Sequence, residues 1–454
     1  MSQALPDGAP PVLDLVGVGF GPSNLAMAAA LEEHNATAPE ISAVTARFLE
    51  RQPRFGWHRG MLIDDATMQV SFLKDLVTLR NPASRYSFLC YLQSVGRLVD
   101  FVNHKSLFPL RIEFHDYFEW AAARLSGQVD YGHAVVGVRP VEREGVVAEL
   151  EVRSRAADGT ETLQRARNLV LAPGLRPRLP DGVEAGERIW HTSELLHRVE
   201  KLDPDEPRRF VVVGAGQSAA EAVGLLHRRF PAAEVCAVFS RYGYSPADDS
   251  SFANQIFDPD AVDDYFTAPE ETKRRLMGYH RNTNYAVVDL DLIDDLYGRV
   301  YQEKVLGTER LRMLKASRPV EVQAGPDRVR ITVESLVTGE TTPLDADAVV
   351  YATGYHQPDP LALLGDLADH VLRDAEGRPR VGRDYRLLTG PGVECGLYLQ
   401  GGTEHTHGIT SSLLSNTAIR VGEILDSVLA HRAAAAGRTP TPTPPAQRAA
   451  ATTS

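Results

Sequence analysis

The chain has 454 residues, of which 43% are hydrophobic and 24% charged, an ordinary composition for a globular protein of two or three domains. Asp and Glu number 60 against 48 Lys and Arg, a net charge of -12, which argues against nucleic acid or an anionic membrane as the main partner. No apolar run approaches the ~20 residues of a membrane helix, and the N-terminus lacks the features of a signal peptide.

The three cysteines, Cys90, Cys236 and Cys395, are far apart and odd in number. This pattern fits a reducing cytoplasm, excludes a Cys-x-x-Cys redox pair, and provides no thiolate metal site of the usual spacing. We therefore expect a cytoplasmic protein without a bound metal. Residues 433–454 consist mostly of Ala, Thr, Pro, Arg and Gly, a composition that predicts a disordered tail.

A unit of strand, glycine turn and helix occurs twice along the chain. The first copy comprises a strand at 12–16, a turn at 17–24, a helix at 25–34 and a strand at 47–49 that ends in Glu50. The second comprises a strand at 210–213, a turn at 214–219, a helix at 220–228 and a strand at 235–239 that ends before Ser240. Further strands are predicted at 146–152, 169–172, 329–336 and 348–351, and an amphipathic helix at 411–430.

Strands that alternate with helices predict parallel sheets and an α/β fold. We expect two Rossmann-like dinucleotide-binding domains, the second inserted into the first, plus a smaller substrate-binding region. The expected divisions are 12–205 for the first part of the first dinucleotide domain, 206–345 for the second dinucleotide domain with a substrate-contacting segment at 248–300, and 346–432 for the completion of the first domain and a substrate-contacting helix.

The first glycine turn has the residues of a pyrophosphate site. Gly17, Gly19 and Gly21 allow a sharp turn and a close approach of the backbone to phosphate. Pro22 replaces the third glycine of the fingerprint, and proline is tolerated in a first helical turn. Glu50 can accept from the ribose hydroxyls. The alternative is a plain glycine-rich turn with a surface glutamate; the order of strand, turn, helix and acid favours FAD.

The second turn contains Gly214, Gly216, Gln217 and Ser218, and Ala219 takes the third place of the fingerprint. No acid follows its second strand; Ser240 and Arg241 stand there instead. An acid would repel a 2′-phosphate, whereas arginine and serine can bind it, so this site is predicted to hold NADPH. The alternative for Arg241 is a solvated charge at a strand end.

Two dinucleotide sites without a cysteine pair exclude the disulfide reductases and leave enzymes that activate oxygen on a reduced flavin. At this point the sequence resembles the microbial ornithine and lysine N-monooxygenases of siderophore assembly. The resemblance extends from Asp14 to about Ile424. It is carried by the blocks 16–25, 68–76, 81–89, 216–221, 248–254, 352–355 and 406–409.

The resemblance implies roles for individual residues. It implies catalytic roles for Gln217, Lys74 and Asn284, with Gln217 holding NADP+ against the flavin and Lys74 near the substrate carboxylate. Further cofactor contacts are implied for Trp57, His58, Gln69, Arg111, Tyr285, Ala352, Thr353 and Gly354. Substrate contacts are implied for Lys74, Asn254, Asn284 and Ser415.

The implied reaction is hydroxylation of a side-chain amine by a flavin hydroperoxide formed from FAD, NADPH and O2. The block 282–289 resembles the ornithine-acting branch, so L-ornithine giving N5-hydroxy-L-ornithine is the favoured reaction. L-lysine, a diamine, and a non-catalytic flavin- and nucleotide-binding regulator are the alternatives. The family also implies a homo-oligomer, either a dimer or a tetramer. His405 and His407 are expected to be loop histidines near the flavin rather than metal ligands, and Asp248 and Asp249 to form a turn or cap.

Overall fold

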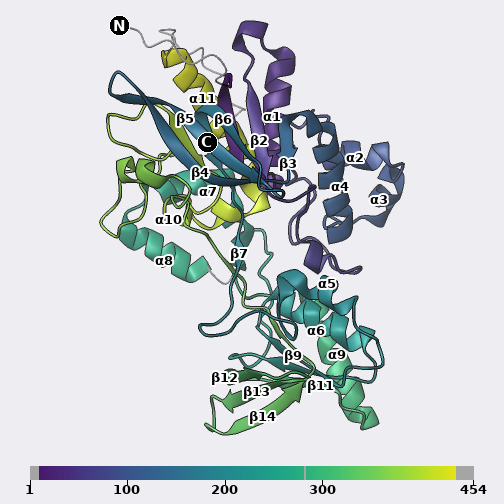
Figure 1. Ribbon diagram of the computed structural model, residues 1–454. Helices are drawn as coiled ribbons and strands as arrows, with labels where there is room; N and C mark the ends of the chain where they lie inside the picture. The colour runs from purple at the N-terminus through teal and green to yellow at the C-terminus, as the bar shows by residue number, and fades with distance from the viewer. Residues whose placement is uncertain (1–9, 281–282, 436–454) are drawn as a thin grey trace.

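The structure, a computed structural model, describes residues 10–280 and 283–435. The chain forms two lobes, each built around its own sheet, and Figure 1 shows the first lobe above the second. The first lobe contains the N-terminal strand and the C-terminal helix, so the chain leaves this lobe and returns to it.

The first sheet has the strand order β3-β2-β1-β6-β5-β4, and β17 also pairs with β6. Strands β1, β2, β3, β6 and β17 pair in parallel, whereas β4, β5 and β6 form an antiparallel meander. Their bounds are β1 Val12–Val18, β2 Ala46–Glu50, β3 Val129–Tyr131, β4 His133–Arg143, β5 Val146–Ala156, β6 Glu161–Leu171 and β17 Gly396–Leu399.

Helices cover this sheet and complete the first core. Helix α1 packs against α4 and α11, and apolar side chains of all three are buried together. The bounds are α1 Pro22–Thr37, α2 Phe88–Ser94, α3 Leu98–His104, α4 Arg111–Arg124 and α11 Thr417–Ala435. Helix α1 begins directly after Gly21 with Pro22 in its first turn, where the fixed φ of proline suits a helix start.

The second sheet is parallel throughout, with the order β11-β10-β9-β15-β8. Side chains on one face pack against α6, and those on the other pack against the antiparallel sheet β12-β13-β14, so the central strands are apolar on both faces. The bounds are β8 Ile189–His191, α5 Leu195–Val199, β9 Arg209–Val213, α6 Gln217–Arg229, β10 Glu234–Val238, α9 Leu290–Leu306, β11 Leu311–Leu314, β12 Ser317–Ala324, β13 Val329–Ser335, β14 Thr341–Ala346 and β15 Ala348–Tyr351.

The strands of the second sheet lie between β6 and β17 in the sequence, so the second lobe is an insertion in the first, as expected. The expected boundaries at 205/206 and 345/346 do not coincide with those of the sheets, because β8 and β15 both belong to the second sheet. Two chain segments connect the lobes. They pair with each other through the short antiparallel strands β7 (Arg176–Pro177) and β16 (Tyr355–His356).

Two expectations for the C-terminal region were wrong in their limits. The amphipathic helix begins at Thr417 rather than at 411, because two 3-10 turns at Ile409–Ser412 and Leu414–Asn416 precede it. It also continues to Ala435, beyond the expected start of the tail at 433. Residues 436–454 lie outside the described residues. Within 10–280 and 283–435, no helix is long and apolar enough to cross a membrane.

The segment 248–300 contains α7 (Pro259–Thr267) and α8 (Glu270–His280), and it reaches back to the first lobe. Helix α7 packs against α10 (Glu404–His407), and Figure 1 shows these helices side by side. A Cβ on Gly408 would lie 3.2 Å from the ring of Tyr265 in α7. A part of the inserted segment therefore belongs spatially to the first lobe.

A buried ion pair joins the lobes on their other side. Arg111 at the start of α4 donates from its two terminal nitrogens to Glu221 of α6, at 2.8 and 2.6 Å. Arg111 also donates to the carbonyl oxygen of Met61 at 3.0 Å. Arg111 is 9% exposed and Glu221 6%, so each charge depends on the other for compensation.

Replacing Arg111 with Met should lower the free energy of unfolding by about 3–5 kcal/mol, because Glu221 would remain buried without a cation. Urea denaturation of the parent and the variant measures the change. The double variant Arg111→Met/Glu221→Leu should recover part of the loss, since no unpaired charge remains. Equal stability of the parent and the single variant would contradict this description of the pair.

Candidate active site

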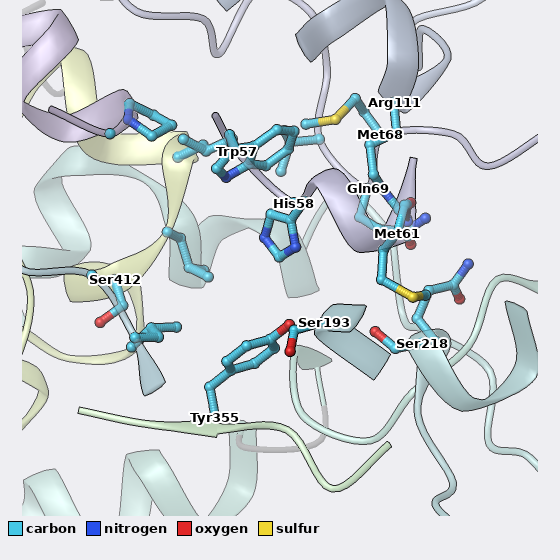
Figure 2. A pocket seen from close by; sticks show the side chains of 18 of the residues that line it. Trp57, His58, Met61, Met68, Gln69, Arg111, Ser193, Ser218, Tyr355 and Ser412 are labelled. Atoms are coloured by element: carbon cyan, nitrogen blue, oxygen red, sulfur yellow. Dashed lines mark hydrogen bonds between the residues drawn. The ribbon is translucent and has the colours of Figure 1, made fainter. Parts of the chain in front are cut away.

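A cavity of about 2340 Å³ lies between the lobes, and both glycine turns open into it. The first turn contributes Gly19, Gly21 and Pro22 to the cavity wall, and the second contributes Gln217 and Ser218. Figure 2 shows Trp57, His58 and Tyr355 at this space, and the rings of His58 and Tyr355 meet edge-on with centroids 6.3 Å apart. The cavity is large enough for two dinucleotides and a small substrate.

The first glycine turn has the geometry of a phosphate-binding turn. Gly19 has φ +82, and a Cβ there would lie 2.4 Å from the carbonyl oxygen of Ala172. A Cβ on Gly17 would lie 2.2 Å from the ring of Phe48, so these two glycines are needed for folding. A Cβ on Gly21 would meet nothing within 4 Å, which leaves open space at the N-terminus of α1. This arrangement fits the pyrophosphate of FAD.

Glu50 is buried at the end of β2 and braces the same turn. Its carboxylate accepts the backbone N–H of Phe20 at 2.6 Å and that of Gln52 at 2.8 Å. These bonds fix the carboxylate at the cavity wall, where each oxygen retains a second lone pair. The predicted contact of Glu50 with a ribose stays a prediction that this geometry allows.

Aromatic and imidazole side chains form the central wall. The ring of Trp57 packs edge-on against Phe118, with centroids 5.2 Å apart, and the ring of His58 lies 4.6 Å from that of Trp57. His58 has a left-handed backbone, φ 50, and its ring faces the cavity. The surrounding protein and the charge of Arg111 lower the pKa of His58 to about 4, so the ring is neutral at pH 7.

Backbone segments of the same protein pack closely against the second turn on both sides. Gly214 has φ +149, and a Cβ there would lie 2.6 Å from the carbonyl oxygen of Ala352. A Cβ on Gly216 would lie 3.3 Å from the Cα of Ala286. Arg241 donates to the carbonyl oxygen of Ala286 at 2.8 Å, so its guanidinium lies beside the turn, where a 2′-phosphate is expected.

Hydrogen bonds to both ends of its amide fix the Gln217 side chain. Its amide nitrogen donates to Glu221 at 3.1 Å and to Asp289 at 3.0 Å, and its amide oxygen accepts the backbone N–H of Asp289 at 2.8 Å. Gln69 donates to the same oxygen of Asp289 at 2.6 Å. The two predicted cofactor-facing amides therefore meet at one carboxylate.

The four predicted substrate residues line the same cavity: Lys74, Asn254, Asn284 and Ser415. Among the residues that the structure describes, no carboxylate lies within 4 Å of the Lys74 ammonium. The Ser415 hydroxyl is buried and has no hydrogen-bond partner in the described structure. Asn254 uses its amide nitrogen for the carbonyl oxygens of Asp249, at 2.7 Å, and Ser250, at 3.2 Å, which leaves its amide oxygen as an acceptor.

Other predicted residues do not line the cavity: Gly17, Gly214, Gly216, Ser240, Arg241, Tyr285, Ala352, Thr353 and Gly354. Thr353 donates to the carbonyl oxygen of Arg178, and the carbonyl oxygen of Gly354 accepts the backbone N–H of Arg178 at 3.0 Å. The Tyr285 hydroxyl donates to Glu404 at 3.2 Å. The cofactor contacts predicted for these residues stay predictions.

Arg111 does line the cavity, but its guanidinium is engaged by Glu221, which the sequence analysis did not single out. Asp289 and Tyr355 were also missed. All three lie within or directly beside the sequence blocks that carry the resemblance: Glu221 ends the second glycine turn block, Asp289 ends the block 282–289, and Tyr355 follows Gly354. A polar residue at the end of such a block was the available signal.

His405 and His407 lie on the short helix α10 rather than in a loop, and neither lines the cavity, so their position near the flavin stays a prediction. His407 is buried and stacks on Tyr385, with ring centroids 4.0 Å apart, and burial lowers its pKa to about 3. His405 lies 2.9 Å from the carbonyl oxygen of Pro379. Asp248 accepts the backbone N–H of Ser250 at 3.1 Å, which confirms its turn role.

Two dinucleotide-type turns that face one cavity, without a cysteine pair there, define the class of two-domain flavoprotein oxidoreductases. The family model for L-lysine 6-monooxygenase/L-ornithine 5-monooxygenase matches residues 11–357. The chain therefore belongs to the L-lysine 6-monooxygenase/L-ornithine 5-monooxygenase family of FAD- and NADPH-dependent enzymes.

Individual relatives agree with this assignment. The chain is 44% identical to an L-ornithine N(5)-monooxygenase of Burkholderia cepacia over 87% of this chain and 90% of that protein. An ornithine N-hydroxylase of Kutzneria sp. 744, solved with reduced FAD, NADP+ and L-ornithine, is 49% identical, with a TM-score of 0.89 over 93% of this chain and all of that one. An L-lysine 6-monooxygenase of Pseudomonas syringae is 32% identical, with a TM-score of 0.80 over 92% of this chain and 99% of that one.

Two glycines of the first turn should respond differently to alanine. Gly19→Ala should lower the free energy of unfolding of the FAD-free protein by about 1–3 kcal/mol, because of its positive φ and the contact with Ala172. Gly21→Ala should leave that stability unchanged but weaken FAD binding, because its methyl group would enter the open space. Thermal unfolding and FAD titration of each apoprotein measure the two effects. Parent-like FAD affinity in Gly21→Ala would remove this turn from the flavin site.

Arg241→Ala should raise KM for NADPH about tenfold while leaving KM for NADH nearly unchanged, because a charged hydrogen bond to the 2′-phosphate is lost. Steady-state oxidation of both cofactors measures the ratio. Arg318→Ala is a matched control, since Arg318 pairs with Glu334 on the antiparallel sheet of the same lobe. An equal effect of Arg241→Ala on both cofactors would exclude Arg241 from 2′-phosphate binding.

Proposed function

We propose that the protein hydroxylates the side-chain nitrogen of L-ornithine to give N5-hydroxy-L-ornithine. One NADPH, one proton and one O2 are consumed per turnover, and NADP+ and water are released with the product. The bound flavin supplies the oxygen-activating chemistry. The proposal rests mainly on one observation: an unpaired ammonium, a buried hydroxyl and two amides from distant segments share the cavity of both glycine turns.

This set of side chains suits the two charged groups of a free amino acid. Lys74 offers a cation to the α-carboxylate, and the Asn254 amide oxygen offers an acceptor to the α-ammonium. Ser415 and Asn284 provide further polar groups in the same cavity. With the α-carbon anchored in this way, the side-chain amine extends toward the wall of Trp57, His58 and Gln69.

The reacting amine must be neutral to have a lone pair for attack on oxygen, and a lysine-type amine has pKa ~10.4 in water. A cavity that excludes water lowers that pKa, because desolvation disfavours the ammonium form. Attack by the neutral amine needs no side-chain nucleophile, and the His58 ring, whose pKa is lowered to about 4, adds no positive charge to the wall at pH 7. We therefore assign no side chain as an acid–base catalyst.

The ornithine-acting relatives support ornithine over lysine, and they include the solved Kutzneria enzyme. The difference between the two substrates is one methylene, worth about 1–3 kcal/mol of discrimination. The deciding measurement is a product assay with ornithine, lysine and a diamine in parallel. Absence of hydroxylated amine with all three, despite bound FAD, would favour a nucleotide-binding regulator.

Assembly into dimers or tetramers stays a proposal, and sedimentation analysis of the purified protein tests it.

Lys74→Ala should raise KM for ornithine strongly, by the equivalent of ~2–5 kcal/mol, because the substrate carboxylate loses its cation in a desolvated site. Putrescine, which has no carboxylate, should be a poor substrate of the parent and respond little to the substitution. Initial rates of product formation measure both. Lys201→Ala, at an exposed lysine outside the cavity, is the control. Putrescine turnover equal to that of ornithine would contradict the carboxylate contact.

A further inference from the structure

Asp289 occupies the N-cap position of α9, yet its side chain makes no cap hydrogen bond. Aspartate is among the preferred N-cap residues because its carboxylate can accept the free N–H groups of a first helical turn. Here the carboxylate faces the cavity instead and accepts from Gln69 at 2.6 Å and from Gln217 at 3.0 Å, both on Oδ2. The helix therefore gives up the usual capping contact at this position.

These bonds determine which way the amide of Gln217 points. Its oxygen accepts the backbone N–H of Asp289, while its nitrogen donates to the carboxylates of Asp289 and Glu221. A flipped amide would place its oxygen against two carboxylates and its NH2 against an N–H donor. The surroundings of Gln217 thus permit one orientation.

Gln69 is held from the opposite lobe by the same oxygen. Because its nitrogen donates to Asp289, its amide oxygen remains available to the cavity. Figure 2 shows Gln69 on the same wall as Arg111, Met61 and His58. Asp289 therefore fixes one amide from each lobe at the place where the two dinucleotide sites meet.

Keeping a carboxylate at this place is unfavourable in itself. Burial and the nearby charge of Glu221 raise the pKa of Asp289, and the bonds from Gln69 and Gln217 act in the opposite direction. The charge of Arg111 also lowers the pKa of Asp289, but both terminal nitrogens of Arg111 donate to Glu221 and none to Asp289. The Asp289 carboxylate is unfavourable at this place and does not cap the helix, which indicates a role other than stabilising the fold.

We propose that Asp289 is a positioning residue that acts through Gln69 and Gln217. It engages the amide nitrogens and so fixes the positions of the two amide oxygens where the dinucleotide sites meet. It thereby determines how tightly NADP+ is retained and what fraction of the oxygen consumed reaches the amine. The expected effect on the fraction of oxygen that reaches the amine rests on the proposed function. The expected effect on NADP+ affinity is measured independently of that function.

The test compares Asp289→Ala and Asp289→Asn with the parent. Asp289→Ala removes the acceptor and should weaken NADP+ binding to the oxidised flavoenzyme about tenfold, the value of one charge-assisted hydrogen bond. Asp289→Asn keeps an acceptor but loses the charge, so a shift of roughly threefold is expected. Titration with NADP+, followed by the flavin absorption spectrum, measures the binding without turnover.

The same variants should retain FAD and still oxidise NADPH, while hydrogen peroxide per NADPH rises and hydroxylated ornithine falls to match. Asp294→Asn is the matched control, because Asp294 is an exposed acid of α9 outside the cavity. A merely structural role of Asp289 would lower the melting temperature and the FAD content but leave NADP+ affinity and coupling per folded enzyme unchanged. That result would overturn the proposal.

A double-mutant cycle tests whether Asp289 acts through Gln217. In a Gln217→Ala background, Asp289→Ala should weaken NADP+ binding by much less than tenfold, whereas independent residues would give additive losses. Additive losses would contradict the positioning role. If the parent forms no hydroxylated amine, the proposed function fails while the NADP+ titration still decides on Asp289. If Asp289→Ala does not fold, parent-like NADP+ affinity in Asp289→Asn would overturn the proposal.

Discussion

A guanidinium and a carboxylate, both buried, meet where α4 of the first lobe faces α6 of the second. Neither group could stay there alone, because an unpaired buried charge costs several kcal/mol. Arg111 and Glu221 therefore fix the spacing of the two lobes at one edge of the cavity. The packing of α7 against α10 attaches the inserted segment to the first lobe at another place. Between these contacts, the glycine turns of both sheets face the same space. A hydride transfer between two dinucleotides requires this arrangement.

The pair also begins a polar network that continues to the site. Glu221 accepts from Gln217, Gln217 is bound to Asp289, and Asp289 accepts from Gln69 of the first lobe. Each amide in this series has its orientation set by a neighbour, so the wall is preorganised before ligands bind. Preorganised donors and excluded water are the two contributions that a protein can make when the cofactor provides the oxygen chemistry.

The sequence predicted what depends on local chain chemistry. Gly19 takes a positive φ in the predicted turn, Pro22 suits a helix start, and the apolar run ending at Val213 forms the predicted strand of a parallel sheet. It did not predict what depends on distant pairing. The membership of β8 and β15 in the second sheet, the Arg111–Glu221 pair, separated by 110 residues, and the role of Asp289 all arise from tertiary contacts. The start of α11 was missed because 3-10 turns share the apolar pattern of a helix.

Fixed side chains in the cavity determine how ornithine and lysine are distinguished, because they set where the substrate amine must lie. Lys74, Asn254 and Ser415 line the cavity, and Gln69 and Gln217 belong to the hydrogen-bonded network of the same cavity. A substrate anchored by its α-carboxylate then places its amine at a distance set by side-chain length. An additional methylene gains a little apolar contact but displaces the nitrogen from the reacting oxygen, and a misplacement of 1 Å can cost about 10²-fold in rate. Discrimination should therefore appear in turnover and in coupling more than in affinity, because both substrates present the same charged end to the same residues.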